Sequence, residues 1–269
     1  MARYMVIGAH PDDCESVGGI MLKLVDLGHS VHFLTATNGC SGHHIQMGGA
    51  IAARRRQEAD RVSALTGVEY EMLDFDDGSL TAGLPERRAM IAAIRRFSPD
   101  VIITHRPSDY HPDHRNTSVL VQDSAFLVQV PNVCPLTPAM RSMPAVFYMQ
   151  DDFQKPYPFE PDLVFSIDQT MERKLRMYHQ YTSQMYEWLP WVGQTLGEGA
   201  VPEGDEERFE WLKGTRHFLI SQETADRYRA QLVEKYGEAG RQVQFCEALE
   251  ICEYGEKPDA ARLRELFPF

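Results

Sequence analysis

The chain has 269 residues, of which 43% are hydrophobic, and this length accommodates one large α/β domain or two small ones. Its net charge of −12, from 27 basic and 39 acidic residues, argues against nucleic acid or an anionic membrane as a partner, because both are bound by basic patches. An apolar run of about 18 residues is absent, so no transmembrane helix is expected.

The first residues and the cysteines predict a cytoplasmic protein. Residues 1–3 lead straight into an apolar segment, so we expect no signal peptide. The five cysteines are odd in number, widely spaced and without a Cys-x-x-Cys pair. This usage is typical of free thiols in a reducing compartment.

Short apolar strands alternate with helices over most of the chain. The predicted strands are 4–8, 30–37, 68–73, 101–104, 145–149 and 163–167, and the predicted helices are 17–27, 50–66, 85–97, 115–130 and 171–188. This alternation favours an α/β fold, a Rossmann-like, mainly parallel, doubly wound sheet with helices on both faces. Residues 185–269 are predicted to form a helical C-terminal extension.

Two His-Pro-Asp clusters follow the first and fourth predicted strands. Residues 9–15 read Ala-His-Pro-Asp-Asp-Cys-Glu, and residues 109–114 read Asp-Tyr-His-Pro-Asp-His. In the simplest doubly wound order these two strands are neighbours, and ligands bind beyond the carboxyl ends of such strands. Two imidazoles and one carboxylate around an open position are the ligands of a catalytic divalent metal ion. The sequence therefore predicts a metal site where the clusters meet.

Together the two clusters resemble the PIG-L/LmbE-like family of metal-dependent N-acetylglucosaminyl deacetylases. Supporting similarities are found at 37–39 (Thr-Asn-Gly), 55–58 (Arg-Arg-Gln-Glu), 76–78 (Asp-Asp-Gly) and 183–184 (Ser-Gln). The resemblance covers about residues 4–184 and implies a single deacetylase-like domain over 1–269, with 185–269 as its extension. One departure is Cys14, which separates Asp13 from Glu15 and leaves the role of that glutamate open.

The resemblance implies a metal centre and a general base. Its metal ligands would be His10, Asp13 and His114, with Zn²⁺ as the default ion and Fe²⁺ or another divalent ion as the alternative. Asp12 would take a proton from metal-bound water. The alternative role of Asp12 is to cap the following helix.

Further residues are assigned by the same resemblance. His111 would be protonated and act on the oxyanion or the leaving amine, and Asp113 would orient it and favour its charge. The alternative for Asp113 is to support a metal ligand. Arg55, Asp77 and Tyr110 would bind an N-acetylated amino-sugar small molecule.

Two other interpretations remain open. A non-haem Fe(II) oxygenase also uses two histidines and one carboxylate, but it needs no base such as Asp12 beside them. A non-catalytic metal-binding module would depend on neither Asp12 nor His111. The loop with His43 and His44 is either an additional metal site or a polar loop, and homo-oligomer formation also stays open.

Overall fold

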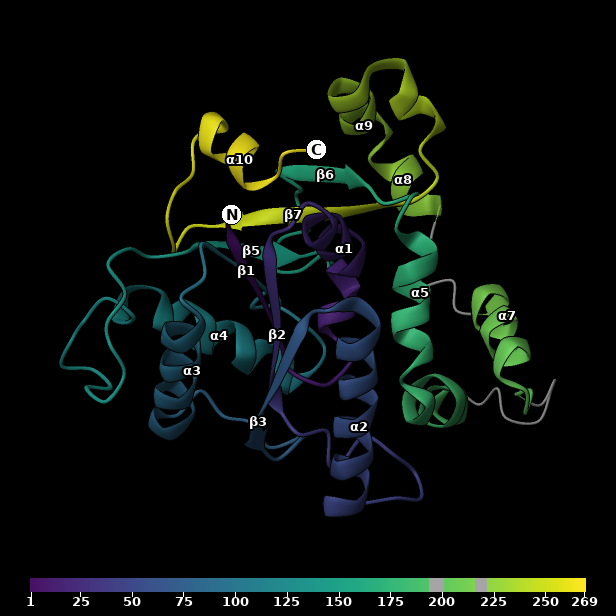
Figure 1. Ribbon diagram of the computed structural model, residues 1–269, viewed down its shortest axis with the longest axis horizontal. Helices are drawn as coiled ribbons and strands as arrows, with labels where there is room; N and C mark the ends of the chain where they lie inside the picture. The colour runs from purple at the N-terminus through teal and green to yellow at the C-terminus, as the bar shows by residue number, and fades with distance from the viewer. Residues whose placement is uncertain (194–200, 216–221) are drawn as a thin grey trace.

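The structure is a computed structural model that describes residues 1–193, 201–215 and 222–269. In the described chain one sheet has the strand order β3-β2-β1-β4-β5-β7-β6 (Figure 1). Neighbouring strands are parallel except at β7, which runs antiparallel to β5 and β6. The strands are β1 (Arg3–Gly8), β2 (Ser30–Thr37), β3 (Glu69–Phe75), β4 (Val101–Thr104), β5 (Ala145–Met149), β6 (Leu163–Ser166) and β7 (Cys246–Cys252).

Helices cover both faces of the sheet, with α1, α2 and α5 on one side and α3 and α4 on the other (Figure 1). The helices are α1 (Gly18–Asp26), α2 (Gly49–Thr66), α3 (Leu84–Phe97), α4 (Pro112–Leu127), α5 (Met171–His179), α6 (Leu189–Val192), α7 (Asp205–Thr215), α8 (Gln222–Arg227), α9 (Arg229–Tyr236) and α10 (Ala260–Leu266). Two 3₁₀ helices, η1 (Cys14–Val17) and η3 (Gly237–Gln242), and a π-helical turn, η2 (Gln184–Trp188), complete the described elements.

The central strand β1 explains why both faces must be covered. Its side chains alternate, so Tyr4 and Val6 join the core beneath α1, α2 and α5, while Met5 and Ile7 join the core beneath α3 and α4. All four side chains are fully buried. A strand buried on both faces reads as a continuous apolar run, which is what the sequence has there.

The predicted Rossmann-like fold is confirmed, including the neighbouring positions of the first and fourth strands. Ile7 of β1 lies opposite Thr104 of β4, so both strands end at the same edge of the sheet. The C-terminal segment is less helical than predicted, because β7 inserts between β5 and β6. The predicted helix 171–188 ends early, since α5 stops at His179 and the chain resumes as η2.

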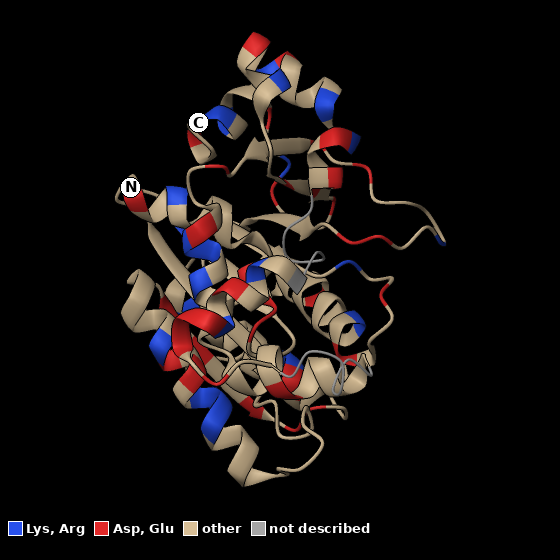
Figure 2. Ribbon diagram, turned by 90° about the vertical axis from the view of Figure 1, so that its right-hand side faces the viewer, with Lys and Arg blue, Asp and Glu red and all other residues tan. Residues whose placement is uncertain are grey.

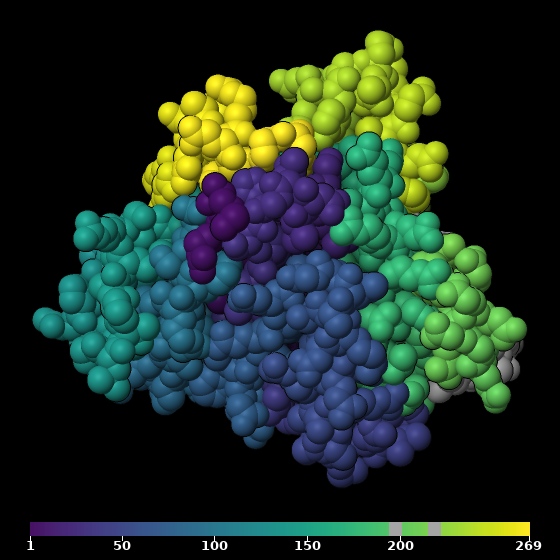
Figure 3. All heavy atoms as spheres, in the orientation of Figure 1, coloured from purple at the N-terminus to yellow at the C-terminus, as the bar shows by residue number. Residues whose placement is uncertain are grey.

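The two ends of the described chain pack against each other. In the space-filling view the yellow C-terminal residues lie beside the purple N-terminal segment (Figure 3). The Tyr4 hydroxyl donates to the carbonyl of Leu266, and the Tyr4 ring contacts Phe267 at a centroid distance of 6.0 Å. The final helix therefore stabilises β1, the strand that leads into the first His-Pro-Asp cluster.

Charged residues of both signs are interspersed along the helices (Figure 2). Many form local pairs, such as Arg56 with Asp60 at 2.9 Å and Arg173 with Asp26 at 2.7 Å. Exposed pairs of this kind contribute little to stability. Among the described helices, none combines the length and the apolar character that a membrane crossing needs.

One buried carboxylate, that of Glu247 in β7, pairs with Lys174 of α5 and accepts hydrogen bonds from the start of α1. Glu247 of β7 accepts the Lys174 ammonium at 2.7 Å and the backbone N–H groups of Gly19 at 2.9 Å and Ile20 at 2.7 Å. A carboxylate at a helix N-terminus is favoured because it accepts N–H groups that have no partner within the helix. Lys174 also donates to the carbonyl of Ser16 at 2.7 Å.

Replacing Glu247 by Ala should lower the free energy of unfolding by about 3–5 kcal/mol, because it leaves Lys174 charged, buried and unpaired. Urea unfolding followed by circular dichroism measures the change. Glu253→Ala removes an exposed carboxylate just beyond β7 and serves as the matched control. An equally small effect for both variants would contradict a supporting role for Glu247.

Candidate functional site

The turn after β1 is closed by the carboxylate of Asp13. Asp13 Oδ2 accepts the backbone N–H groups of Ala9 at 2.9 Å and His10 at 2.7 Å. A Cβ atom at Gly8 would lie 2.7 Å from the Asp13 Cβ, so glycine is needed for the strand to approach this side chain. The end of β1 therefore fixes the position of the Asp13 carboxylate.

The three predicted metal ligands meet around one point. The distance from His10 Nδ1 to Asp13 Oδ2 is 3.4 Å, from His114 Nε2 to Asp13 Oδ2 3.5 Å, and from His114 Nε2 to His10 Nδ1 3.3 Å. Ligands bound tetrahedrally at 2.0–2.1 Å from an ion lie roughly 3.3–3.5 Å apart. The triangle of donor atoms therefore has the size that a small divalent ion requires.

The remaining ring nitrogens of both histidines face carboxylates. His10 Nε2 lies 3.2 Å from Asp113 Oδ2 and 3.2 Å from Asp77 Oδ1, and His114 Nδ1 lies 3.1 Å from Asp109 Oδ2. A carboxylate on one nitrogen holds the proton there and leaves the other nitrogen free to bind a metal. This arrangement selects Nδ1 of His10 and Nε2 of His114 as the ligand atoms.

The carboxylates around the two imidazoles favour a cation at this place. Burial disfavours a charged ring, yet hydrogen bonds to carboxylates, that of Asp113 foremost, raise the pKa of His10 well above its ordinary value. The pKa of His114 is also raised, because the Asp13 and Asp109 carboxylates outweigh its burial. A divalent ion at the three donor atoms would satisfy the same excess of negative charge, so the residues fit a metal ion.

His105 lies in the same cluster but is already engaged. Its Nε2 accepts the backbone N–H of Ala9 at 3.0 Å and lies 3.2 Å from Asp13 Oδ2. Its ring stacks on His114, with centroids 4.0 Å apart. Because the Nε2 lone pair receives an N–H group, His105 is suited to support His114 rather than to bind an ion itself.

Asp12, the predicted base, is held in an unusual backbone conformation by Arg55. Its φ of 116° is rare for a residue with a side chain. Arg55 donates to Asp12 Oδ1 at 2.9 Å and to the carbonyl of Pro11, while the Asp12 N–H donates to the Tyr70 hydroxyl at 3.4 Å. Burial raises the pKa of Asp12 to about 6, and the Arg55 charge opposes this rise.

His111 directly precedes α4 as its N-cap residue and is oriented by the backbone. Its Nδ1 accepts the backbone N–H of Asp113 at 3.2 Å, which leaves Nε2 to carry the proton of the neutral ring. Burial lowers the pKa of His111, and the charges of His10 and His114 lower it further. The structure thus favours a neutral donor at His111 rather than the protonated ring that we expected.

The carboxylate of Asp113 is used elsewhere, contrary to its predicted contact with His111. Besides His10, it accepts the backbone N–H groups of Gly78 at 2.7 Å and Leu80 at 3.2 Å. Among the described residues these hydrogen bonds account for both of its oxygens. The alternative role, support of a metal ligand, agrees with this geometry, although the ligand concerned is His10.

The three predicted substrate-binding residues differ in their access to solvent. Arg55 and Asp77 are buried, at 2% and 8% exposure, behind Asp12 and His10, whereas Tyr110 is 71% exposed. Asp77 also accepts the backbone N–H of Ser41 at 3.3 Å. That these residues bind substrate stays a prediction, and in the structure Arg55 and Asp77 directly support catalytic candidates.

Asp109 and His105 support the cluster but were missed in the sequence, and the role of Glu15 was left open there. Asp109 lies in the second cluster only two residues before His111, but nothing in the sequence showed that it faces His114. Glu15, whose role was open, is fully buried and accepts the Tyr181 hydroxyl at 2.6 Å. Burial raises its pKa to about 8, so Glu15 connects η1 to the segment after α5 instead of lining the site.

The segment after α5 is joined to the loop between β2 and α2. Gln184 donates to the carbonyl of Gly42 at 2.8 Å, and His43 Nε2 lies 2.9 Å from Glu187 Oε2. Arg54 of α2 donates to both oxygens of Glu187. His43 is thus paired with a carboxylate, and neither it nor His44 belongs to a metal-like group among the described residues.

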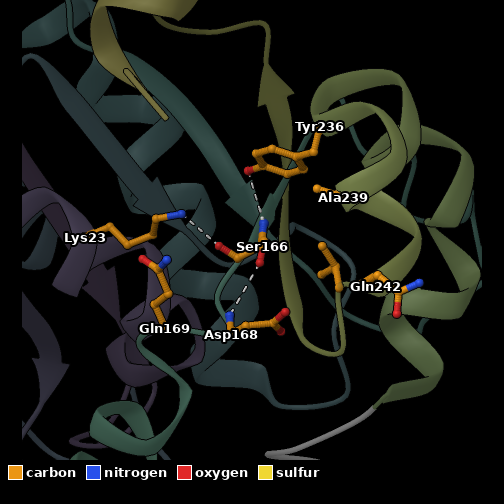
Figure 4. A pocket seen from close by; sticks show the side chains of 8 residues that line it. Lys23, Ser166, Asp168, Gln169, Tyr236, Ala239 and Gln242 are labelled. Carbon is orange, nitrogen blue, oxygen red and sulfur yellow. Dashed lines mark hydrogen bonds between the residues drawn. The ribbon is translucent and has the colours of Figure 1, made fainter.

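Two cavities lie apart from this cluster and contain none of its residues. One, of about 310 Å³, is enclosed by α1, β6 and η3 (Figure 4). Three of the residues that line it bond to one another, since Lys23 donates to the Ser166 carbonyl at 2.9 Å and the Ser166 N–H donates to the Tyr236 hydroxyl at 3.3 Å. The other, of about 580 Å³, lies between α3 and the segment 132–137.

Comparison with known families agrees with the two clusters. Residues 5–125 match the PIG-L family, described as GlcNAc-PI de-N-acetylase. This segment contains both His-Pro-Asp clusters and the elements that carry them. The resemblance to the PIG-L family is thereby confirmed.

Solved structures share the fold over nearly the whole chain. The N,N'-diacetylchitobiose deacetylase of Pyrococcus horikoshii is 24% identical, with a TM-score of 0.66 over 94% of this chain and 84% of its own. The 4-carboxy-2-hydroxymuconate hydratase GalB of Pseudomonas putida KT2440 is 18% identical, with 0.70 over 96% and 99%. The A40926 pseudoaglycone deacetylase Dbv21 is 17% identical, with 0.60 over 95% and 99%. These likenesses establish the fold, and the site residues must decide the chemistry.

The metal site can be tested by metal analysis. His10→Ala, Asp13→Ala and His114→Ala should each lose most of the tightly bound ion, because two donor atoms hold it far less well than three. His111→Gln should keep the ion. Mass spectrometry of protein loaded with Zn²⁺ and passed over a desalting column gives the stoichiometry. If His111→Gln alone loses the ion, His111 and not Asp13 completes the metal site with His10 and His114.

Proposed function

We propose that this protein is a metal-dependent hydrolase that removes the N-acetyl group from an N-acetylglucosamine-containing small molecule. The observation that carries the proposal is the triangle of His10 Nδ1, Asp13 Oδ2 and His114 Nε2, with edges of 3.3–3.5 Å, next to a paired carboxylate at Asp12. The match of residues 5–125 to the PIG-L family supports the same chemistry.

Zn²⁺ is the proposed ion, with Fe²⁺ as the alternative. Two imidazoles and one carboxylate leave a fourth tetrahedral position open, as catalytic zinc sites do. An ion bound there would lower the pKa of water to about 7 and polarise the acetamide carbonyl.

Asp12 and His111 have separate roles in this proposal. The ionised Asp12 carboxylate accepts the proton of the attacking water, while Arg55 keeps that carboxylate charged and in place. The neutral His111 donates an Nε2–H hydrogen bond to the oxyanion that forms on the acetamide carbonyl, and the proton that Asp12 has accepted passes to the departing amine nitrogen. Asp113, Asp77 and Asp109 position the two ligand histidines.

Asp12 is the feature that favours a hydrolase over an Fe(II) oxygenase. An oxygenase needs no carboxylate base beside its three ligands, and a non-catalytic module has no use for a strained, half-buried aspartate. Here Asp12 has a φ of 116° and a pKa raised to about 6. Strain and a perturbed pKa at one residue are typical of functional sites.

The activity can be tested by acetate release from a panel of N-acetylglucosamine conjugates. The Zn²⁺-loaded protein should release acetate, chelation should abolish the release, and added metal should restore it. Asp12→Asn should keep the metal and lose about 10²–10⁴ in rate, the usual range for a general base. Turnover that depends on O₂ and a 2-oxo acid would replace the hydrolase by an oxygenase.

The acid limb of the pH profile should depend on Arg55. Activity rises with pH as Asp12 ionises, and the positive charge of Arg55 lowers the pKa of Asp12. Arg55→Leu removes that charge, so the pKa rises further and the acid limb of kcat/KM moves to higher pH. Because Asp12 and the bound water are close, the limb reports them as a coupled set.

The matched control for this measurement is Arg56→Leu. Arg56 is the next residue on α2 but is exposed and pairs with Asp60 at 2.9 Å. Its removal should leave the acid limb in place. If Arg55→Leu also leaves the limb unmoved, Asp12 does not control the acid side of the profile.

A further inference from the structure

A buried arginine holds the segment between β5 and β6 at the edge where the site lies. Arg106 lies two residues after the end of β4 and is only 1% exposed. It donates to Asp151 Oδ1 at 2.6 Å, to the Tyr157 carbonyl at 2.7 Å and to the Phe153 carbonyl at 3.4 Å. The Tyr157 ring also lies over the guanidinium, 4.7 Å from its carbon to the ring centroid.

These contacts provide acceptors for both terminal nitrogens of the buried guanidinium, and its Nε faces Glu250 Oε2 at 3.8 Å without a hydrogen bond. A buried guanidinium is tolerated only when its N–H groups find acceptors and its charge a partner. The segment 150–162 has neither helix nor strand and contains three prolines, so it lacks a hydrogen-bonding pattern of its own. Arg106 supplies the fixed donor, and Asp151 accepts both Arg106 and the backbone N–H of Phe153, at 3.0 Å.

Phe153, whose carbonyl accepts a hydrogen bond from Arg106, contacts Tyr110 beside the site. The Phe153 ring lies nearly parallel to the Tyr110 ring, with centroids 6.2 Å apart and planes 29° from each other. The Tyr110 ring in turn contacts His114 at 5.6 Å and His111 at 5.7 Å. An aromatic surface therefore begins beside the two imidazoles and continues to Phe153, with Tyr110 largely open to solvent.

We propose that Tyr110 and Phe153 form an aromatic platform for the apolar face of the pyranose that carries the reacting acetamide, and that Arg106 positions this platform. The inference rests on the proposed function and deepens it. Phe153 would be a specificity-determining residue, and Arg106, which acts through the segment 151–157, would be a positioning residue.

The chemistry of the two sides of the site favours this occupant. Carboxylates and a guanidinium surround the ligand triangle, whereas Tyr110 and Phe153 provide two aromatic rings and one hydroxyl. A pyranose has C–H groups on one face and hydroxyls around its rim, so it can satisfy an aromatic surface and polar groups together. An acyclic acetamide could reach the ligand triangle but would leave the platform uncovered.

The first experiment compares two acetamides, an N-acetylglucosamine glycoside and 2-acetamidoethanol. Phe153→Ala should raise KM for the glycoside about tenfold with little change in kcat, so the ratio of kcat/KM between the two substrates falls about tenfold. Phe126→Ala, at an exposed phenylalanine of α4, is the matched control and should leave that ratio unchanged. An unchanged ratio in Phe153→Ala would overturn the platform.

The second experiment asks whether Arg106 acts through Phe153. Arg106→Lys keeps the charge but loses the planar fork of donors, so KM for the glycoside should rise severalfold. In the Phe153→Ala background the same change should add little. Arg95→Lys is the control. Arg95 is also buried and donates to backbone carbonyls, such as those of Val128 and Val133. It lies in the last turn of α3, before the start of β4, whereas the site lies beyond the carboxyl end of that strand.

A direct binding measurement separates this inference from the proposed function. Zn²⁺-loaded Asp12→Asn protein is titrated with N-acetylglucosamine, with and without Phe153→Ala, by calorimetry. Weaker binding upon loss of Phe153 supports the platform even if the protein hydrolyses none of the tested conjugates. Three results together would reject the platform: hydrolysis of the glycoside, equal affinities with and without Phe153→Ala, and fully additive effects of the Arg106 and Phe153 substitutions. The proposed deacetylase activity would still hold in that case.

Discussion

The carboxylate of Asp13 is the contact on which the site depends. One oxygen closes the turn after β1 by accepting two backbone N–H groups, and it faces the ring nitrogens of His10 and His114 within 3.5 Å. Burial alone would raise its pKa, but the histidine charges, foremost that of His114, hold the pKa of Asp13 well below its usual range. A single ionised oxygen thus connects the backbone of one strand end to a helix that follows another strand.

This arrangement requires that β1 and β4 be neighbours, and that much could be predicted from the sequence. Two apolar strands, each followed by a His-Pro-Asp cluster, make sense in a doubly wound sheet only when the strands end side by side. The order β3-β2-β1-β4-β5 fulfils this condition. The three ligand candidates followed from it together with the family resemblance.

The supporting contacts could not be predicted in the same way. Which nitrogen of His10 faces an ion depends on where Asp77 and Asp113 lie, and those positions depend on the loop after β3 and the first turn of α4. The sequence places Asp113 between His111 and His114, and proximity along the chain favoured a contact with His111. In the structure the helix directs that carboxylate to His10 instead, and Asp109 faces His114. Similarly, the sequence of β7 has no alternation of apolar and polar residues strong enough to predict a strand among the surrounding helices.

The fold is shared with both a hydratase and deacetylases at 17–24% identity, so the sheet by itself does not select a reaction. The sheet supplies an edge at which several chain segments meet. Two buried arginines, Arg55 and Arg106, hold different segments at that edge. Arg55 pairs with Asp12, where its charge favours the ionised carboxylate. Arg106 faces the segment 151–157, where its donors replace missing secondary structure. Both roles use a planar group with several fixed donors and a permanent charge, which a lysine ammonium does not offer. The cluster of histidines and aspartates and the segment 151–157 are therefore held by different arginines, and Tyr110 contacts both parts. A change in the segment 151–157 can therefore alter the surface beside the cluster while Arg55 and Asp12 keep their contacts.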